Sequence, residues 1–407
     1  MSFLSKQLSP SIKQYLLITI NYWAFTLTDG ALRMLVVLYF HQLGYSPLNI
    51  AFLFLFYEFF GVITNLVGGW LGAKLGLNKT MNIGLFIQII ALAMLTIPSE
   101  YLSVIYVMMA QALSGIAKDL NKMSAKSAVK LLIPDEKQGL LYQWVAFLTG
   151  SKNTLKGVGF FLGGLLLTVL GFTNAIISLA SALSIILMFS LFTLQKDLGK
   201  AKNKPKFTHI FSKSASINIL SATRMFLFAA RDVWFVVALP VFLATKFNWN
   251  YWLVGSFMAS WIIGYGIIQT IAPYITGTNQ NKTPTANLAM KWVSYLTLIQ
   301  AIIALALQLD FYLHYSIIIG LFIFGAIFAI NSSLHSYLIV SYADKNTVSL
   351  DVGFYYMANA MGRLIGTILS GFIYQKYGLE ACLWISSGFL AISTLLSSRI
   401  SPHKSVL

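Results

Sequence analysis

The chain has 407 residues, of which 57% are hydrophobic and only 10% are charged. Soluble domains average about 45–50% apolar and 25% charged residues, so the composition excludes an ordinary soluble enzyme. The net charge of +16 would fit a nucleic-acid-binding protein only if the basic residues gathered on one water-facing surface. The mean hydropathy of +0.75 favours a bundle of membrane-spanning helices instead.

Apolar runs long enough to span a bilayer recur along the whole sequence, separated by short polar breaks. At about 30–35 residues per span and loop, the length allows roughly 12 spans. No small-residue cleavage site precedes a polar domain, so we expect the first helix to stay in the protein. The sequence predicts an all-α integral membrane protein with twelve transmembrane helices, at 15–40, 47–73, 80–98, 101–131, 138–170, 173–194, 216–244, 251–275, 286–309, 312–341, 350–377 and 380–399.

The basic residues of the connections indicate the orientation, because cytoplasmic loops retain lysine and arginine. With the N-terminus in the cytoplasm, the opposite side carries only Lys246 and Lys376. We therefore expect both termini in the cytoplasm and the protein in the inner membrane. The longest polar stretch lies midway and predicts a basic cytoplasmic linker at 196–215 between six-helix bundles at 1–195 and 216–407. Anionic lipid headgroups near such a linker explain its lysines better than nucleic acid does.

The two predicted bundles share residues at near-constant spacing, which favours an internal duplication and hence two pseudo-symmetric halves. Phe25 and Asp29 recur as Phe228 and Asp232. Further along, Lys156, Gly164 and Gly171 recur as Arg363, Gly371 and Gly378 at one common offset.

The charged residues inside the predicted spans are the strongest indication of function in this sequence. A charge at the bilayer centre costs about 2.5–3.5 kcal/mol on insertion scales, so it should face a water-filled cavity or a partner. Apart from the charges at the span ends and those assigned to the loops, nine basic residues stand there against four acidic residues, and internal pairing cannot neutralise that excess. The basic residues are Arg33, Lys118, Lys122, Lys126, Lys152, Lys156, Arg224, Arg231 and Arg363, and the acidic residues are Asp29, Glu58, Asp119 and Asp232.

Helical spacing groups several of these cations. Lys118, Lys122 and Lys126 recur every fourth residue and form one stripe, and Lys152 and Lys156 form a second. A cavity with several cationic walls favours a multiply charged anion with phosphate-like oxygens, because arginine supplies bidentate donors and lysine point charges. Near mid-depth, where carrier sites usually lie, we place Asp29, Lys118, Lys152, Lys156, Arg231 and Arg363.

These positions lead to specific role assignments. We expect Lys118, Lys152, Lys156 and Arg363 to bind the substrate, and Arg33 and Arg231 to shape the field around it. The candidates for proton coupling or for ion pairs are Asp29, Glu58, Asp119 and Asp232.

Each assignment has a structural alternative. Ion pairs of Asp29 with Arg33, and of Asp232 with Arg231 or Arg224, weigh about equally with a functional role. Lys126 and Arg224 are interpreted as snorkelling toward the inner interface. Glu58 is either a proton-coupling carboxylate or the partner of a surplus lysine.

Two motifs resemble those of the major facilitator superfamily. The connection at 69–79 (GWLGAKLGLNK) is similar to the G-x-L-A-D-R-x-G-R-K loop between the second and third helices of that superfamily. The match rests on Gly69, Gly72, Lys74 and Gly76, which the resemblance implies to be a gating loop, and it departs at Ala73, where the family carries an acid. The segment 159–164 (GFFLGG) resembles the antiporter motif G-P-x-x-G-G of the fifth helix. The resemblance implies the major facilitator superfamily fold.

A narrower resemblance covers most of the chain. The segments that carry it are 25–35 (FTLTDGALRML), 55–61 (LFYEFFG), 114–120 (SGIAKDL), 149–153 (TGSKN), 156–159 (KGVG) and 229–235 (AARDVWF). They resemble the organoarsenical efflux permeases of the ArsJ type. The resemblance implies export of 1-arseno-3-phosphoglycerate, which a glyceraldehyde-3-phosphate dehydrogenase makes when arsenate replaces phosphate, and hence resistance to arsenate. The dehydrogenase is then the functional partner that supplies the substrate.

Two other functions remain as alternatives: a carrier or exchanger for another organophosphate or sugar phosphate, and a non-transporting membrane sensor, which the lack of a soluble output domain disfavours. The sequence contains neither a Walker loop nor spaced metal ligands, and its one cysteine, Cys382, excludes a disulfide framework. We therefore expect no enzymatic activity, no cofactor, no metal and no nucleic acid, and a monomer in the lipid bilayer.

Overall fold

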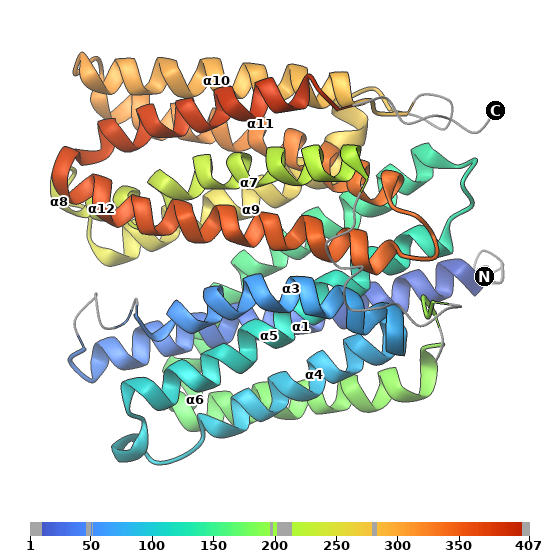
Figure 1. Ribbon diagram of the computed structural model, residues 1–407. Helices are drawn as coiled ribbons and strands as arrows, with labels where there is room; N and C mark the ends of the chain where they lie inside the picture. The colour runs from blue at the N-terminus through green and yellow to red at the C-terminus, as the bar shows by residue number, and fades with distance from the viewer. Residues whose placement is uncertain are drawn as a thin grey trace, which may run out of the picture.

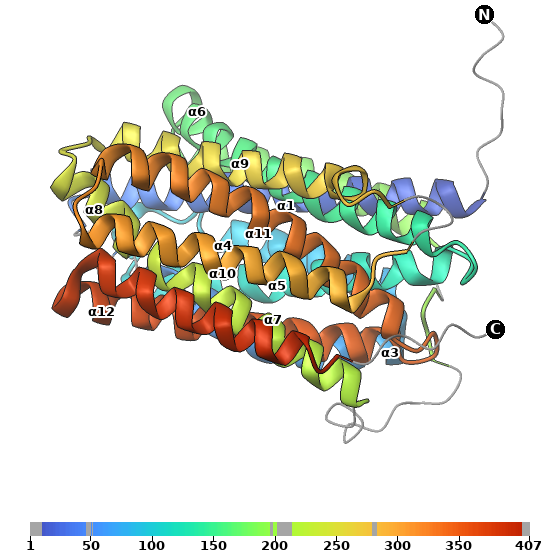
Figure 2. The same cartoon turned by 90° about the horizontal axis from the view of Figure 1, so that it is seen from above.

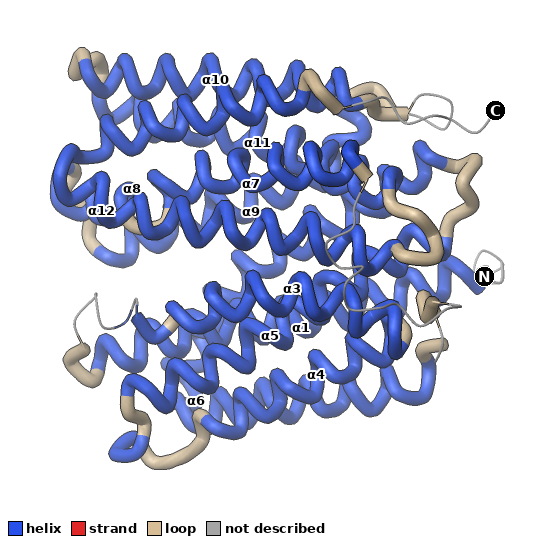
Figure 3. Tube along the Cα trace, in the orientation of Figure 1, coloured by secondary structure: helices blue, strands red, loops and turns tan. Residues whose placement is uncertain are grey.

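The computed structural model describes residues 10–45, 50, 52–195, 198–201, 214–278 and 283–400, and these ranges contain helices and no strand (Figure 3). The helices form two groups, which we call the N-terminal half (α1 and α3 to α6) and the C-terminal half (α7 to α12) (Figure 1). The predicted all-α fold is confirmed.

The helices of the N-terminal half are α1 (Pro10–Gln42), α3 (Leu55–Leu75), α4 (Leu77–Met94), α5 (Val104–Leu132) and α6 (Gln138–Thr193), with the short 3₁₀ helix η1 (Ser99–Tyr101) before α5. Those of the C-terminal half are α7 (Ala215–Phe235), α8 (Ala238–Lys246), α9 (Tyr251–Ile275), α10 (Ala286–Gln308), α11 (Leu313–Tyr342) and α12 (Val348–Ser397). Polar residues cap several starts: the side chains of Ser103, Ser214, Asn250 and Thr285 accept hydrogen bonds from backbone N–H groups of the first turn.

The two longest helices each double back at a glycine. Gly171 in α6 has φ = +72° and Gly378 in α12 has φ = +76°, a backbone conformation that glycine adopts at little cost. Both breaks fall in the predicted gaps between spans. Eight described helices are long and apolar enough to cross a membrane, and α6 and α12 each count once among them. The count of twelve spans stays a prediction.

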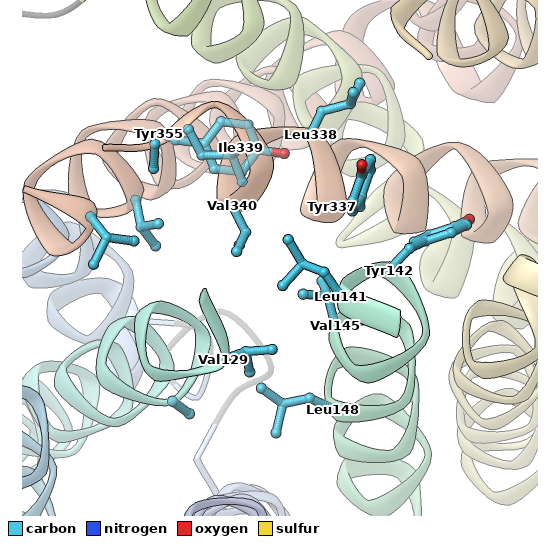
Figure 4. Packing of buried hydrophobic residues seen from close by; sticks show 14 of the residues in the cluster. Val129, Leu141, Tyr142, Val145, Leu148, Tyr337, Leu338, Ile339, Val340 and Tyr355 are labelled. Carbon is cyan, nitrogen blue, oxygen red and sulfur yellow. The ribbon is translucent and has the colours of Figure 1, made fainter. Parts of the chain in front are cut away.

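The buried apolar residues show how the halves are joined. The start of α1 and the end of α12 lie at the same end of the bundle, which we call the terminal end (Figures 1 and 2). There, one cluster contains residues of both halves, including Leu141 and Tyr142 of α6 with Tyr337 and Leu338 of α11 (Figure 4). Toward the opposite end, each half has a separate cluster of its own. The halves therefore share an apolar cluster at the terminal end, and among the described residues no such shared cluster lies at the other end.

The linker predicted at 196–215 lies mostly outside the described residues. Its described part, 198–201, bonds to the junction of α3 and α4: the carbonyl of Leu198 accepts from the N–H of Leu77 at 2.8 Å, and the N–H of Ala201 donates to the carbonyl of Ala73 at 2.9 Å. These bonds satisfy backbone groups that helix ends leave open. The domain boundaries at 195 and 216 stay predictions.

Candidate functional site

Glu58 of α3 is the centre of an ion-pair network that connects the two halves. Its Oε1 accepts hydrogen bonds from Nη2 of Arg363 at 2.9 Å and from Nη2 of Arg33 at 3.3 Å. Arg363 of α12 also donates through Nε to Oδ2 of Asp232 at 3.2 Å, and Asp232 pairs with the adjacent Arg231. The side chains of Glu58, Arg33 and Arg363 keep 21%, 26% and 26% of their surface accessible, so water reaches this network.

Tyr57 connects this network to two further charges. Its hydroxyl donates to Oδ1 of Asp29 at 2.7 Å, so the carboxylate of α1 has a partner on α3. The Tyr57 ring lies 4.7 Å from the Arg33 guanidinium and 3.9 Å from the Lys118 ammonium, which are cation–π distances. The sequence does not single out Tyr57 as a site residue. The one signal that could have pointed to it is its position beside Glu58 in an aromatic run.

The lysine stripe of α5 follows the predicted helical face. Lys118 and Lys122 both pair with Asp119, at 3.6 and 2.5 Å. Lys126, one turn further along, donates to the hydroxyl of Tyr356 on α12, in the opposite half, and is only 3% exposed. The interpretation of Lys126 as a snorkelling residue is therefore wrong, because its ammonium lies between the halves and not toward the membrane surface.

Arg224 of α7 is equally buried, at 3% exposure. Its Nε donates to Oδ1 of Asn359 at 2.9 Å, its Nη1 donates to the carbonyl of Ser332 at 3.4 Å, and its guanidinium lies 4.1 Å from the Phe228 ring centre. These partners all belong to the C-terminal half, and Lys126 of the opposite half is a charged neighbour of Arg224. The snorkelling interpretation is therefore wrong for Arg224 as well.

Lys152 and Lys156 project from α6 toward the other charges. Lys152 donates to Oδ1 of Asn153 at 3.2 Å, and Asn153 in turn donates to Oε1 of Gln269 on α9 at 2.6 Å, which crosses to the opposite half. Among its electrostatic neighbours, Lys152 has Lys126, and Lys156 has Arg33 and Arg363. The structure thus brings the predicted binding lysines of α6 near both the α5 stripe and the arginine network.

The ion pairs show which of the interior cations have a carboxylate partner and which carry the surplus positive charge that the sequence predicts. The carboxylates of Glu58, Asp119 and Asp232 pair with Arg33, Arg231, Arg363, Lys118 and Lys122. Within the described residues, no carboxylate lies within ion-pair distance of the remaining four cations. These four, which we call the unpaired cations, are Lys126, Lys152, Lys156 and Arg224. Asp29 is an electrostatic neighbour of Lys152 and Lys156, and one carboxylate cannot balance four cations.

The predicted gating loop is mostly helical. Gly69, Gly72 and Lys74 belong to the last turns of α3, and only Gly76, with φ = +98°, stands between α3 and α4. The segment contains no proline that would interrupt the helix before Gly76. Gly69 lies against α12: a Cβ at this position would stand 2.5 Å from the backbone carbonyl oxygen of Ser349. These residues pack the two halves together at the terminal end.

The described residues contain no group of three or more His, Cys, Asp or Glu side chains placed to hold a metal ion. The site is instead a set of cations and carboxylates within long apolar helices, at the boundary of two helical halves. Such an interior is typical of membrane carriers.

Comparison with known families agrees with that class. The sequence profile of the Major Facilitator Superfamily matches residues 16–349, and the chain belongs to this superfamily. It is therefore a multi-pass membrane transporter. A comparison with curated protein sequences finds no match.

Solved structures share the fold at low sequence identity. The human organic anion transporter MFSD10 (TETRAN) superposes with a TM-score of 0.76 at 16% identity, over 96% of this chain and 100% of that chain. The proton:xylose symporter XylE gives a TM-score of 0.75 at 11% identity, over 97% of each chain. A bacterial homologue of the iron transporter ferroportin, in an outward-facing state, gives 0.73 at 13% identity, over 95% of this chain and 98% of that one. The major facilitator fold that the sequence predicts is confirmed.

Proposed function

We propose that this transporter exports an anionic organoarsenical, 1-arseno-3-phosphoglycerate, by alternating access and thereby confers resistance to arsenate. The observation that carries the proposal is the set of unpaired cations, Lys126, Lys152, Lys156 and Arg224, between the two halves. Cations that lack a carboxylate partner inside a membrane protein favour an anionic ligand. The resemblance to organoarsenical permeases, given by the segments around Asp29, Lys118 and Lys156, supports this anion in particular.

The roles follow from the contacts. Lys118, Lys152 and Lys156 bind the anionic groups of the substrate, and Arg363 presents a guanidinium from the opposite half. Arg33 and Arg231 set the local field through their pairs with Glu58 and Asp232. Of the carboxylates, Asp29, Glu58 and Asp232 are the candidates for proton coupling, and Asp119 serves as the partner of Lys118 and Lys122.

The proposed orientation of the protein in the membrane determines which end of the bundle is the cytoplasmic gate. The terminal end lies in the cytoplasm and the protein acts as a monomer in the inner membrane, so the packed terminal end is a closed cytoplasmic gate. An inside-negative potential favours expulsion of an anion by about 2.3 kcal/mol per charge per 100 mV. Proton coupling is therefore not required to drive export.

Everted membrane vesicles test the substrate. They are incubated with a glyceraldehyde-3-phosphate dehydrogenase, its substrates and radiolabelled arsenate. Uptake of label that requires the active dehydrogenase is expected. Label that enters equally well without the enzyme, or no entry in either case, rejects the organoarsenical as substrate. Vesicles that instead take up a labelled sugar phosphate identify the alternative, a carrier for another organophosphate.

A further inference from the structure

Lys126 and Arg224 bring two cations from opposite halves to the same buried region. Lys126 comes from α5 and Arg224 from α7, and each is 3% exposed. Among the charged groups around Lys126, Arg224 has the largest electrostatic effect on it. Two aromatic residues of α12 lie beside them: the Tyr356 ring is 4.6 Å from the Lys126 ammonium and the Tyr355 ring 5.5 Å from the Arg224 guanidinium.

The partners of this pair are all neutral. Lys126 bonds to the hydroxyl of Tyr356, and Arg224 bonds to the amide oxygen of Asn359 and the carbonyl of Ser332. Two buried like charges with neutral acceptors repel each other and lose their hydration, which makes the arrangement costly. A bound anion would neutralise both charges at once.

The pair also lies in line with the central cations. Lys126 follows Lys118 by eight residues on the same face of α5, a rise of about 12 Å toward the terminal end. Lys152 of α6 has both Lys126 and Lys118 among its electrostatic neighbours. A ligand with two anionic ends therefore meets one group of cations around Lys152 and Lys156 and a second around Lys126 and Arg224.

We propose that Lys126, Arg224 and Tyr356 form a second anion subsite, which takes a phosphate-type group of a substrate with two anionic ends. This proposal rests on the proposed function, because it assigns the two ends of that substrate. Arginine supplies a fork of donors that matches tetrahedral oxyanions, lysine supplies a point charge, and the tyrosine hydroxyl is free to rotate and donate.

Lys126 belongs to the N-terminal half, whereas Arg224 and Tyr356 belong to the C-terminal half, so the subsite depends on how the halves are arranged. The subsite is closed in this conformation by the apolar cluster at the terminal end and opens when the halves separate there. An anion held by Lys126 of one half and Arg224 of the other favours the return to the closed arrangement. The subsite therefore binds the second anionic group and also favours closure of the terminal gate around it.

Equilibrium binding to the purified protein in nanodiscs tests the subsite with two stable probes, radiolabelled 3-phosphoglycerate and radiolabelled glycerate. The variants are Lys126→Gln, Arg224→Gln and Lys126→Arg, with Lys376→Gln as the control, because Lys376 is exposed and contacts Phe372. Lys126→Gln and Arg224→Gln should each weaken 3-phosphoglycerate binding by at least about tenfold. Both should leave glycerate binding within about twofold of the control, and Lys126→Arg should retain most of the affinity.

The outcomes separate this proposal from the proposed function. Equal losses for both probes, or no loss for either, overturn the subsite, as does a wild-type protein that binds neither probe. If Lys126→Gln shows the selective loss while vesicles take up no arsenate label, the subsite stands and the organoarsenical is rejected. If uptake of arsenate label is normal in Lys126→Gln and phosphoglycerate binding is unchanged, the function stands and the subsite is rejected. Elution as a single species in size-exclusion chromatography shows that each variant is folded.

Discussion

The carboxylate of Glu58 and the guanidinium of Arg363 lie 2.9 Å apart, Oε1 to Nη2, and join α3 of one half to α12 of the other. The same Oε1 also accepts from Arg33. A carboxylate oxygen shared by two arginines stands where an anionic group of a ligand would bind. We propose that Glu58 competes with the substrate for these arginines, and that its displacement releases one connection between the halves.

Replacing Glu58 by glutamine should change binding and turnover in opposite directions. Glu58→Gln leaves Arg33 and Arg363 without this counter-ion, so an anion binds more tightly and leaves more slowly. We expect KM and kcat for transport both to fall, each by about fivefold to tenfold, which corresponds to roughly 1 kcal/mol of lost competition. Initial uptake rates in vesicles over a range of substrate concentrations measure both constants. A raised KM would contradict the competition.

Arg363 should not be replaceable by lysine. Its Nη2 and Nε reach Glu58 and Asp232 at the same time, a geometry that depends on the planar guanidinium. We expect Arg363→Lys and Arg363→Gln both to lose transport, while membrane insertion is retained. Uptake normalised to the amount of protein in the membrane measures the loss, with Lys376→Gln as the control. Transport by Arg363→Lys near the wild-type rate would show that charge alone is sufficient.

The close approach of Gly69 to α12 predicts a conformational effect. Gly69→Ala places a Cβ 2.5 Å from the Ser349 carbonyl oxygen and so strains the packed terminal end, by about 1–3 kcal/mol. The control is Gly264→Ala on α9, because a Cβ at Gly264 meets nothing within 4 Å. We expect the halves to separate at the terminal end in Gly69→Ala only. Thiol labelling of Tyr337→Cys, in a background with Cys382→Ala, should be faster when Gly69→Ala is added. Equal labelling in both backgrounds would contradict this expectation.

Asp135 and Lys345 form an ion pair that joins the halves at the surface of the terminal end. Lys345 Nζ lies 2.7 Å from Oδ2 of Asp135, and both side chains are about half exposed. Exposed pairs contribute about 0–1 kcal/mol, so their loss alone should leave stability nearly unchanged. A reducible bifunctional thiol reagent that spans an ion-pair distance and joins Asp135→Cys to Lys345→Cys, again with Cys382→Ala, should stop transport by holding the terminal end closed, and reduction should restore it. Transport that continues in the cross-linked protein would show that this end need not open.

Much of the fold is predictable from the sequence because apolar periodicity and glycine breaks are local properties. The predicted gaps at Gly171 and Gly378 coincide with the breaks of α6 and α12. The excess of interior cations was likewise visible in the composition, as was the shared face of Lys118, Lys122 and Lys126 on α5.

The partners of those charges were not predictable, because they come from helices far apart in the chain. Arg363 had no acid on its own helix face, yet Glu58 and Asp232 reach it from α3 and α7. The burial of Lys126 depends on Tyr356, which lies 230 residues away. The ion pair of Asp29 with Arg33, one of the two alternatives from the sequence, is not formed, and the hydroxyl of Tyr57 donates to Asp29 instead. A rule based on spacing within one helix cannot find such contacts.

The most direct test compares Lys156→Gln with Lys376→Gln in everted vesicles that receive radiolabelled arsenate and active dehydrogenase. Both changes remove one lysine charge, but only Lys156 belongs to the unpaired cations near Arg33 and Arg363. We expect dehydrogenase-dependent uptake at the wild-type rate in Lys376→Gln and a loss of at least about tenfold in Lys156→Gln. Equal uptake by the two variants would contradict it.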